Sequence, residues 1–192
     1  MTTHPISEST DPRRTRTTIA PVAARSRLVS ATSARVTAAS PERLWTVLAD
    51  EFDAVGDWAS TVEASTAWPA EATHDTPAAD RYCDVPGLGR TRERITAYDP
   101  VARMIGYEVE AHGMPGFLRS VESTWRITPL DSGDAEVRLT IDARVSGPAA
   151  RLLTPMLRSQ FRRTQRRVLA DLDVYARSGE VSGRKARMTA GR

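Results

Sequence analysis

Cysteine and long apolar runs are both scarce in this chain of 192 residues, and each scarcity excludes a class of protein or of site. The single cysteine, Cys83, excludes an intramolecular disulfide and any zinc site built from clustered cysteines. No run of about 18 apolar residues occurs, which excludes a transmembrane helix. The pair Arg13-Arg14 is not followed by the apolar core of an export signal, so we expect a cytoplasmic protein.

The formal charge of +3 conceals a segregation of charge along the chain. Residues 1–27 carry +3, residues 28–150 carry −8 and residues 151–192 carry +8, when Arg and Lys are counted against Asp and Glu. A basic end indicates a nucleic-acid partner, an anionic surface or a solvated helix face. The C-terminal arginines lie largely off an apolar helix stripe, which favours the solvated face, and we expect no nucleic-acid partner.

The apolar content is sufficient for one folded domain, since 40% of the residues are hydrophobic and four are tryptophan. Residues 1–26 are rich in Thr, Ser, Pro and Arg without periodicity and are predicted to form a disordered leader. Residues 179–192 are predicted to be a disordered basic tail. The folded domain is therefore expected over residues 27–178.

Apolar patterns predict an α+β order of one strand, two short helices, six strands and one long helix. Ser40-Pro41 is typical of a helix start, and a second short helix or turn is expected over 52–58. Residues 136–145 alternate between apolar and polar side chains, as in an antiparallel strand with one buried face. Strands are expected at 28–38, 60–68, 79–85, 90–98, 102–111, 118–129 and 136–145.

The final helix, predicted from Pro148 to Arg177, carries one continuous apolar stripe. At about 1.5 Å per residue it would be about 45 Å long, enough to cross a sheet. A seven-stranded antiparallel sheet needs cover on its apolar face, and only this helix is long enough to provide it. A sheet curled around one helix leaves a space of the kind that often holds ligands.

Four segments of the chain occur in a familiar order and spacing: ARVTAASPERLWTVLADEFDAVGDW, ERITAYDPVARMIGYEV, STWRITP and the Gly-Pro start of the final helix. Together they resemble the START/SRPBCC superfamily, and most closely its polyketide cyclase/dehydrase-like branch, over about residues 28–178. The resemblance implies the helix-grip fold, a seven-stranded antiparallel sheet wrapped around a long C-terminal helix. It also implies binding of a hydrophobic or amphipathic small molecule, such as a lipid or a polyketide, with an aromatase/cyclase or dehydratase activity as the alternative.

Two of the predicted strands are similar to pocket strands of the plant abscisic acid receptors, a distant branch of the superfamily. The matching segments are TRERI at 91–95 and GYEV at 106–109. The similarity implies that four side chains face the cavity: Thr91, Glu93, Tyr107 and Val109. The gate motif of those receptors is absent, because DVPGLG stands in its place, so a hormone-receptor role is not implied.

The strand expected at 118–129 has two conflicting interpretations. Its segment RSVE resembles a receptor strand that would turn Ser120 and Glu122 inward. The side chains themselves favour Val121 and Trp125 as the inward face, and a bulge near Ser123 would satisfy both patterns. We take Ser120 and Glu122 as cavity residues, and add Ile141 of the last strand and Phe161, Thr164 and Val168 of the helix stripe.

Glu93 is the most informative polar candidate, either as a ligand anchor or acid/base group in the cavity or as a surface partner of neighbouring arginines. Arg81 is expected either to reach inward, to an acidic ligand or to Glu93, or to point outward. His74 and His112 lack cysteine partners at ligand spacing, so we expect no metal, and nothing marks a catalytic residue or a cofactor site. The remaining open choice concerns Trp45, Trp58 and Trp125, which either line the cavity or form ordinary core.

Overall fold

One antiparallel sheet of seven strands dominates the residues that the computed structural model describes, 26–68, 80–147 and 150–191. The strands lie in the order β1-β7-β6-β5-β4-β3-β2, so that every strand after β1 pairs with its neighbour in sequence and β7 closes back onto β1. Their bounds are β1 Arg27–Thr37, β2 Ala64–Ala67, β3 Arg81–Val85, β4 Gly89–Asp99, β5 Met104–Ala111, β6 Leu118–Pro129 and β7 Ala135–Val145.

Short helical turns follow β1 as the sequence predicts. They are α1 Pro41–Trp45, the π-helical turn η1 Thr46–Asp50, the 3-10 turn η2 Phe52–Ala54 and α2 Val55–Trp58. The Ser40 side chain accepts a hydrogen bond from the Arg43 backbone N–H at 3.2 Å, and Pro41 occupies the first turn, where no backbone donor is needed. The predicted helix start is therefore confirmed.

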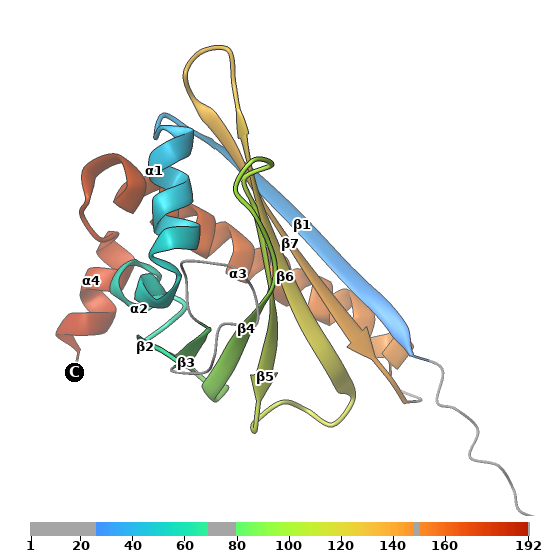
Figure 1. The fold of residues 1–192 in the computed structure, drawn as a ribbon. Coiled ribbons are helices and arrows are strands. Elements are labelled where there is room, and N and C mark those ends of the chain that lie inside the picture. The colour runs from blue at the N-terminus through green and yellow to red at the C-terminus, as the bar shows by residue number, and fades with distance from the viewer. Residues whose placement is uncertain (1–25, 69–79, 148–149, 192) are drawn as a thin grey trace, which may run out of the picture.

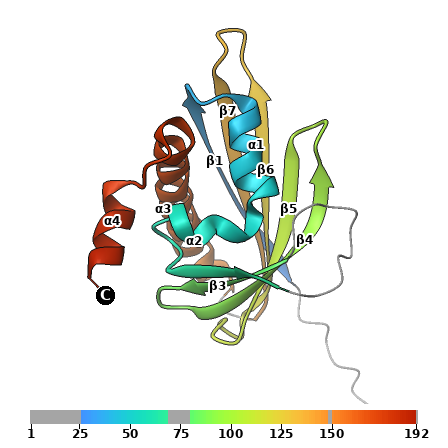
Figure 2. The same cartoon turned by 60° about the vertical axis from the view of Figure 1, so that its left-hand side comes forward.

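The long helix α3, Ala150–Ser178, crosses the sheet and packs mainly against β1 and β7. Figure 1 shows this crossing, and Figure 2 shows the sheet bending from β1 and β7 round to β3. Gly179 ends the helix with a φ of 73°, which glycine adopts without strain. The predicted helix-grip fold is therefore confirmed. No helix among the described residues is long and apolar enough to cross a membrane.

A buried amide holds α3 against the sheet. Gln165 is completely buried, and its Nε2 donates to the carbonyl oxygens of Ala31 at 2.8 Å and Leu139 at 3.1 Å. Its Oε1 accepts a hydrogen bond from the Ser33 hydroxyl at 2.9 Å. Because both ends of the amide are satisfied, the polar side chain is compatible with burial and specifies where the helix sits on β1 and β7.

Asp173 makes a second attachment between α3 and β1. It accepts hydrogen bonds from the Thr37 hydroxyl at 2.6 Å and from Arg35 at 2.8 Å, and Arg177 lies 3.0 Å away. Burial alone would raise the pKa of Asp173, but these hydrogen bonds and the charges of the two arginines outweigh burial and lower the pKa below its ordinary value of 3.8. The charged form is therefore the one that stabilises the fold.

Asp173→Asn should lower the free energy of unfolding by about 1.5–3 kcal/mol at neutral pH, because the charge-assisted hydrogen bonds from Thr37, Arg35 and Arg177 are weakened. A carboxylate whose pKa is depressed contributes stability above its ordinary pKa and loses it as the pH falls through the depressed value. The difference between the two proteins should therefore shrink below about pH 4. Urea unfolding at a series of pH values measures this, with the exposed turn variant Asp131→Asn as the control. A difference that stays constant down to pH 2 would contradict the assignment.

The C-terminal segment differs from its prediction. Residues 179–192 were expected to be a disordered tail, but Gly183–Ala190 form helix α4. Lys185 is buried, and its Nζ donates to the carbonyl oxygens of Val62 at 2.8 Å and Glu63 at 3.3 Å. The composition of the tail predicts disorder because the side chains that hold it in place are polar. The carbonyl groups to which Lys185 donates lie far away in the sequence, so the sequence of the tail does not reveal them. The predicted leader, residues 1–26, lies outside the described residues except for Ser26.

Candidate functional site

A cavity of about 270 Å³ lies between the concave face of the sheet, α3 and the short helical turns. Its walls come from all of these elements, so the cavity exists only when the whole domain is folded. Most of the lining is apolar. Apart from the predicted residues considered next, the lining consists of Val47, Leu48, Phe52, Val55, Trp58, Thr61, Val62, Arg81, Val85, Leu88, Val121, Ser123, Trp125, Leu139 and Gln160.

The structure places eight of the ten predicted site residues at this cavity. They share an inward position on alternating strand residues or on the sheet-facing side of α3, which is the geometry that period-two and helical spacing produce. They are Thr91, Glu93, Tyr107, Val109, Ile141, Phe161, Thr164 and Val168.

Ser120 and Glu122 are not among the lining residues, and the prediction that they face the cavity is wrong. Glu122 is exposed on the outer face of the sheet, where it lies opposite Glu108 and Asp142 in the strand register. Val121, Ser123 and Trp125 point inward. The only register shift of β6 against β7 lies between Leu118 and Ser120, before the segment in question. Because side chains alternate along a strand, Trp125 and Val121 determine the inward face and exclude Glu122 from it.

The central polar feature of the cavity is a buried ion pair. Arg81 on β3 and Glu93 on β4 are register partners, with side chains only 6% and 9% exposed. The Arg81 Nε and Nη2 donate to one Glu93 oxygen at 2.8 and 2.5 Å, and Nη1 donates to the Phe52 carbonyl. The guanidinium carbon lies 3.7 Å from the centre of the Phe52 ring. The inward orientation of Arg81, which the sequence left open, is therefore the observed one.

Cys83 and Tyr107, which lie beside this pair, and Arg81 itself hold their protons at neutral pH. Burial raises the pKa of the Cys83 thiol to about 12 even though the Arg81 charge opposes this, so the thiol is not a nucleophile. Burial also raises the pKa of the Tyr107 phenol to about 12, with the Glu93 charge adding to the effect. For Arg81 burial disfavours the charge, but Glu93 more than compensates and raises its pKa. The cavity thus encloses one cation and one anion that cancel each other.

One of the tryptophans that line the cavity, Trp58, has a buried N–H group without a hydrogen-bond partner among the described residues. Trp125 Nε1, by contrast, donates to the Tyr107 hydroxyl at 3.4 Å. Trp58 and Trp125 line the cavity, and Trp45 instead packs against Tyr98 with ring centres 5.2 Å apart. A buried N–H without a partner is costly, and this one is closed off from solvent, so a ligand acceptor would reach it only if Trp58 moved.

Eight of the lining residues are not fully buried: Gln160, Thr61, Leu88, Val85, Val109, Val121, Phe161 and Thr164. Gln160 on α3 is exposed, and Thr61 after α2 and Leu88 in the β3–β4 turn are half-buried. These three come from separate elements, so a ligand entering beside them would pass between the turn, the loop after α2 and the helix.

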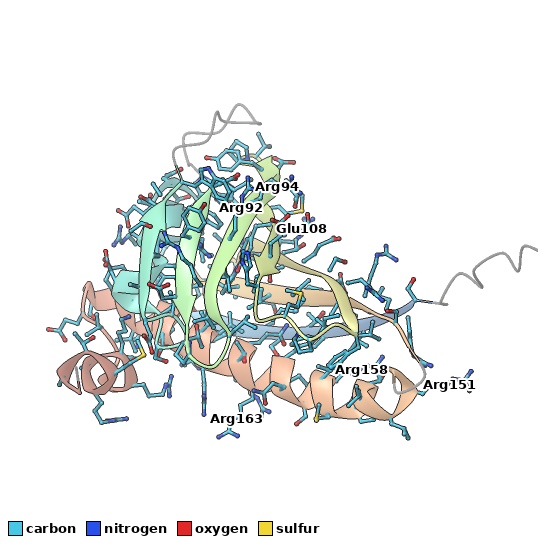
Figure 3. All side chains as sticks on the ribbon, turned by 90° about the horizontal axis from the view of Figure 1, so that it is seen from below. Arg92, Arg94, Glu108, Arg151, Arg158 and Arg163 are labelled. Carbon is cyan, nitrogen blue, oxygen red and sulfur yellow. The ribbon has the colours of Figure 1, made fainter. Side chains whose placement is uncertain are left out.

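A second hollow, of about 450 Å³, lies on the opposite face of the sheet. Its Trp68 and Tyr82 rings are stacked with centres 4.5 Å apart, and Arg92 and Arg90 cover them at 3.2 and 4.4 Å. His112 also lines this hollow, away from the internal cavity. Figure 3 shows Arg92 here, beside Arg94 and Glu108, which form an ion pair at 2.7 Å. The rings and guanidinium groups pack against one another, although the buried Arg92 Nε has no hydrogen-bond partner among the described residues.

Neither hollow offers a metal site among residues 26–68, 80–147 and 150–191. No group of three or more His, Cys, Asp or Glu side chains in these ranges is arranged to hold an ion.

Comparison with known proteins agrees with this geometry. Residues 28–177 match the family described as "Polyketide cyclase / dehydrase and lipid transport". Among solved structures, the chain is similar to the Zhui aromatase/cyclase from Streptomyces sp. R1128, with a TM-score of 0.64 and 16% identity over 81% of this chain and 100% of that chain. No curated protein matches the sequence.

Two further solved structures share the fold. A START superfamily protein from Mycobacterium smegmatis has a TM-score of 0.60 and 17% identity, covering 79% of this chain and 99% of that chain. The protein XoxI from Bacillus cereus has a TM-score of 0.63 and 15% identity, covering 80% and 99%. At these identities the likeness concerns the fold and not the ligand.

Proposed function

The chain belongs to the polyketide cyclase/dehydrase and lipid transport family, and we propose that it binds a hydrophobic or amphipathic small molecule, such as a lipid or a polyketide, in the cavity between the sheet and α3. The observation that carries the proposal is the enclosed and mainly apolar lining, contributed by every layer of the fold. Burial of an apolar ligand there supplies roughly 25 cal/mol for each Å² removed from water, before the costs of association.

The charges in the cavity favour a ligand that is electrically neutral where it is enclosed. Arg81 is already engaged by Glu93 and by the Phe52 carbonyl, so a ligand carboxylate would have to compete for a satisfied guanidinium. The neutral Cys83 and Tyr107 offer no counter-ion.

The size of the cavity limits how much of a ligand it encloses. A volume of about 270 Å³ lies just below the range of about 300–1,000 Å³ that is usual for ligand sites. The proposed ligand is therefore small, or it leaves its polar end in the opening beside Gln160, as an amphipathic molecule would.

The enzymatic alternative, an aromatase/cyclase or dehydratase, rests on the proximity of Glu93 to Arg81 and Tyr107. An acid/base reaction needs a group that accepts a proton and returns it near neutral pH. Tyr107 and Cys83, with pKa values of about 12, do not meet this requirement, and one oxygen of the Glu93 carboxylate already accepts two hydrogen bonds from Arg81. These contacts favour binding over catalysis.

Native mass spectrometry of the purified chain tests the proposal, because a buried apolar ligand should survive purification as a discrete mass increment. A neutral fluorescent apolar probe should also bind with a stoichiometry of one. Its carboxylated analogue should bind at least about ten-fold more weakly, which corresponds to 1.4 kcal/mol. Absence of a co-purified molecule, together with no thermal shift across a panel of lipids and polyphenols, would reject the proposal.

A further inference from the structure

The outward face of α3 carries charge of one sign only. Six arginines are exposed along it, and no acidic residue occurs between residues 143 and 170. Within the described ranges none of the six forms an ion pair, whereas Asp171 and Asp173 of the same helix are buried and hydrogen-bonded elsewhere. The arginines are Arg151, Arg158, Arg162, Arg163, Arg166 and Arg167.

Two large apolar side chains stand exposed among these arginines. Leu152 is 83% exposed and Met156 is 57% exposed, and both lie in the first turns of α3. Residues four apart lie on the same helix face, so Leu152 and Met156 are neighbours, and Arg163 continues their row. Figure 3 shows Arg151, Arg158 and Arg163 along α3, with Arg163 pointing away from the sheet. We call these two apolar residues and the six arginines the basic face.

We propose that the basic face docks on an anionic lipid bilayer. Arginines beside exposed leucine and methionine are typical of helices that lie in a membrane interface, where the cations meet lipid phosphates and the apolar side chains enter the acyl boundary. Nucleic acid explains the arginines but leaves Leu152 and Met156 exposed without a purpose. An acidic protein surface would also bury two apolar side chains, so the vesicle experiment below distinguishes such a partner from a bilayer.

The position of the cavity supports a lipid surface as the partner. Gln160, at the cavity opening, is on α3 between Met156 and Arg163, and Phe161 and Thr164 of the same turns line the interior. Docking through the basic face would therefore bring the opening close to the bilayer. This link rests on the proposed function, since it assumes that an apolar molecule enters the cavity.

Vesicle co-sedimentation of the full chain tests the docking. Vesicles of phosphatidylcholine with phosphatidylglycerol should bind the protein, and vesicles of phosphatidylcholine alone should bind it at least about ten-fold more weakly. Binding should also weaken as salt is raised, because the Debye length falls from about 10 Å at 0.1 M to about 3 Å at 1 M. Equal binding to both kinds of vesicle, or no binding to the anionic ones, would overturn the proposal.

Paired variants identify the face responsible. The double reversal Arg163→Glu and Arg166→Glu should reduce binding to anionic vesicles at least about 25-fold, since each arginine near the surface contributes about five-fold. The matched control, Arg126→Glu with Arg144→Glu, makes the same change in net charge at exposed positions on the outer face of the sheet. It should reduce binding about two-fold or less. Equal losses in the two double variants would show that net charge alone acts and would overturn the proposal.

The apolar residues separate a bilayer from other anionic partners. Leu152→Ser with Met156→Ser should weaken binding to anionic vesicles about ten-fold and leave any binding to duplex DNA unchanged. Binding to DNA without binding to vesicles would replace the proposal with a nucleic-acid site. All these variants should bind the neutral fluorescent probe like the original chain, so a failure of docking is distinguishable from a failure of the cavity.

Discussion

Glu93→Ala should lower the free energy of unfolding by about 3–5 kcal/mol, because it leaves the Arg81 guanidinium buried without its counter-ion. Both side chains are nearly inaccessible, and Glu93 accepts two of the hydrogen bonds that Arg81 makes. Glu93 raises the pKa of Arg81 against the effect of burial, so the variant removes the interaction that compensates for burial of the guanidinium. Urea unfolding followed by circular dichroism measures the loss.

Glu108→Ala is the matched control for this prediction. Glu108 on β5 pairs with Arg94 on β4 at 2.7 Å, one strand along from the Arg81–Glu93 pair on β3 and β4, but the side chains are 28% and 41% exposed. Removal of an exposed pair costs at most about 1 kcal/mol. The double variant Arg81→Met with Glu93→Leu should recover most of the stability, since it removes both buried charges together. A loss below about 1 kcal/mol for Glu93→Ala would contradict the description of the pair.

Val121→Trp should reduce the affinity for a neutral apolar probe at least about 100-fold, which corresponds to about 2.7 kcal/mol. Val121 is half-buried and lines the cavity, so an indole ring at this position occupies space that a ligand needs. Overpacking costs about 1–3 kcal/mol of stability, which a typical domain tolerates. Probe titration gives the affinity, and circular dichroism establishes that the variant is folded.

Glu122→Trp provides the control, because it introduces the same side chain one residue further along β6. Glu122 is exposed on the outer face of the sheet, so probe affinity should change about two-fold or less. Comparable losses in both variants would mean that β6 does not present its side chains as described. The pair therefore tests the cavity and the register of β6 in one experiment.

The fold was predictable because its signals are local. Alternation over β7 and the stripe of α3 recur within short windows, and Ser40 and Gly179 mark helix ends through their own backbone chemistry. The edge strand β2 is shorter than the 60–68 predicted, since its single neighbour, β3, pairs with only Ala64–Ala67. Pairing length depends on the neighbour and is not encoded in the strand itself.

The cavity was predictable where the resemblance and the residue pattern agreed. On β6 the two disagreed, and the residue pattern was correct. Burial of Trp125 and Ile127 lowers the free energy of the folded state, and exposure of Ser120 and Glu122 to water costs little. The inward turn of Arg81 depends on its register with Glu93 and on the Phe52 carbonyl, which strand periodicity alone does not reveal. The lack of a hydrogen-bond partner for the Trp58 N–H among the described residues likewise depends on how the surrounding elements pack, which the sequence alone does not show.

Helix α4 sets the limit at which the chain can be shortened. Asp171 of α3 is completely buried, and it accepts hydrogen bonds from the Ser60 hydroxyl at 2.5 Å, from Ser182 at 2.5 Å and from Arg184 at 3.0 Å. The family match ends at residue 177, before two of these donors. A fragment cut there would retain the sheet and α3 but leave a buried carboxylate with part of its shell missing. Expression fragments, crystallisation trials and domain fusions therefore need to extend through Ala190.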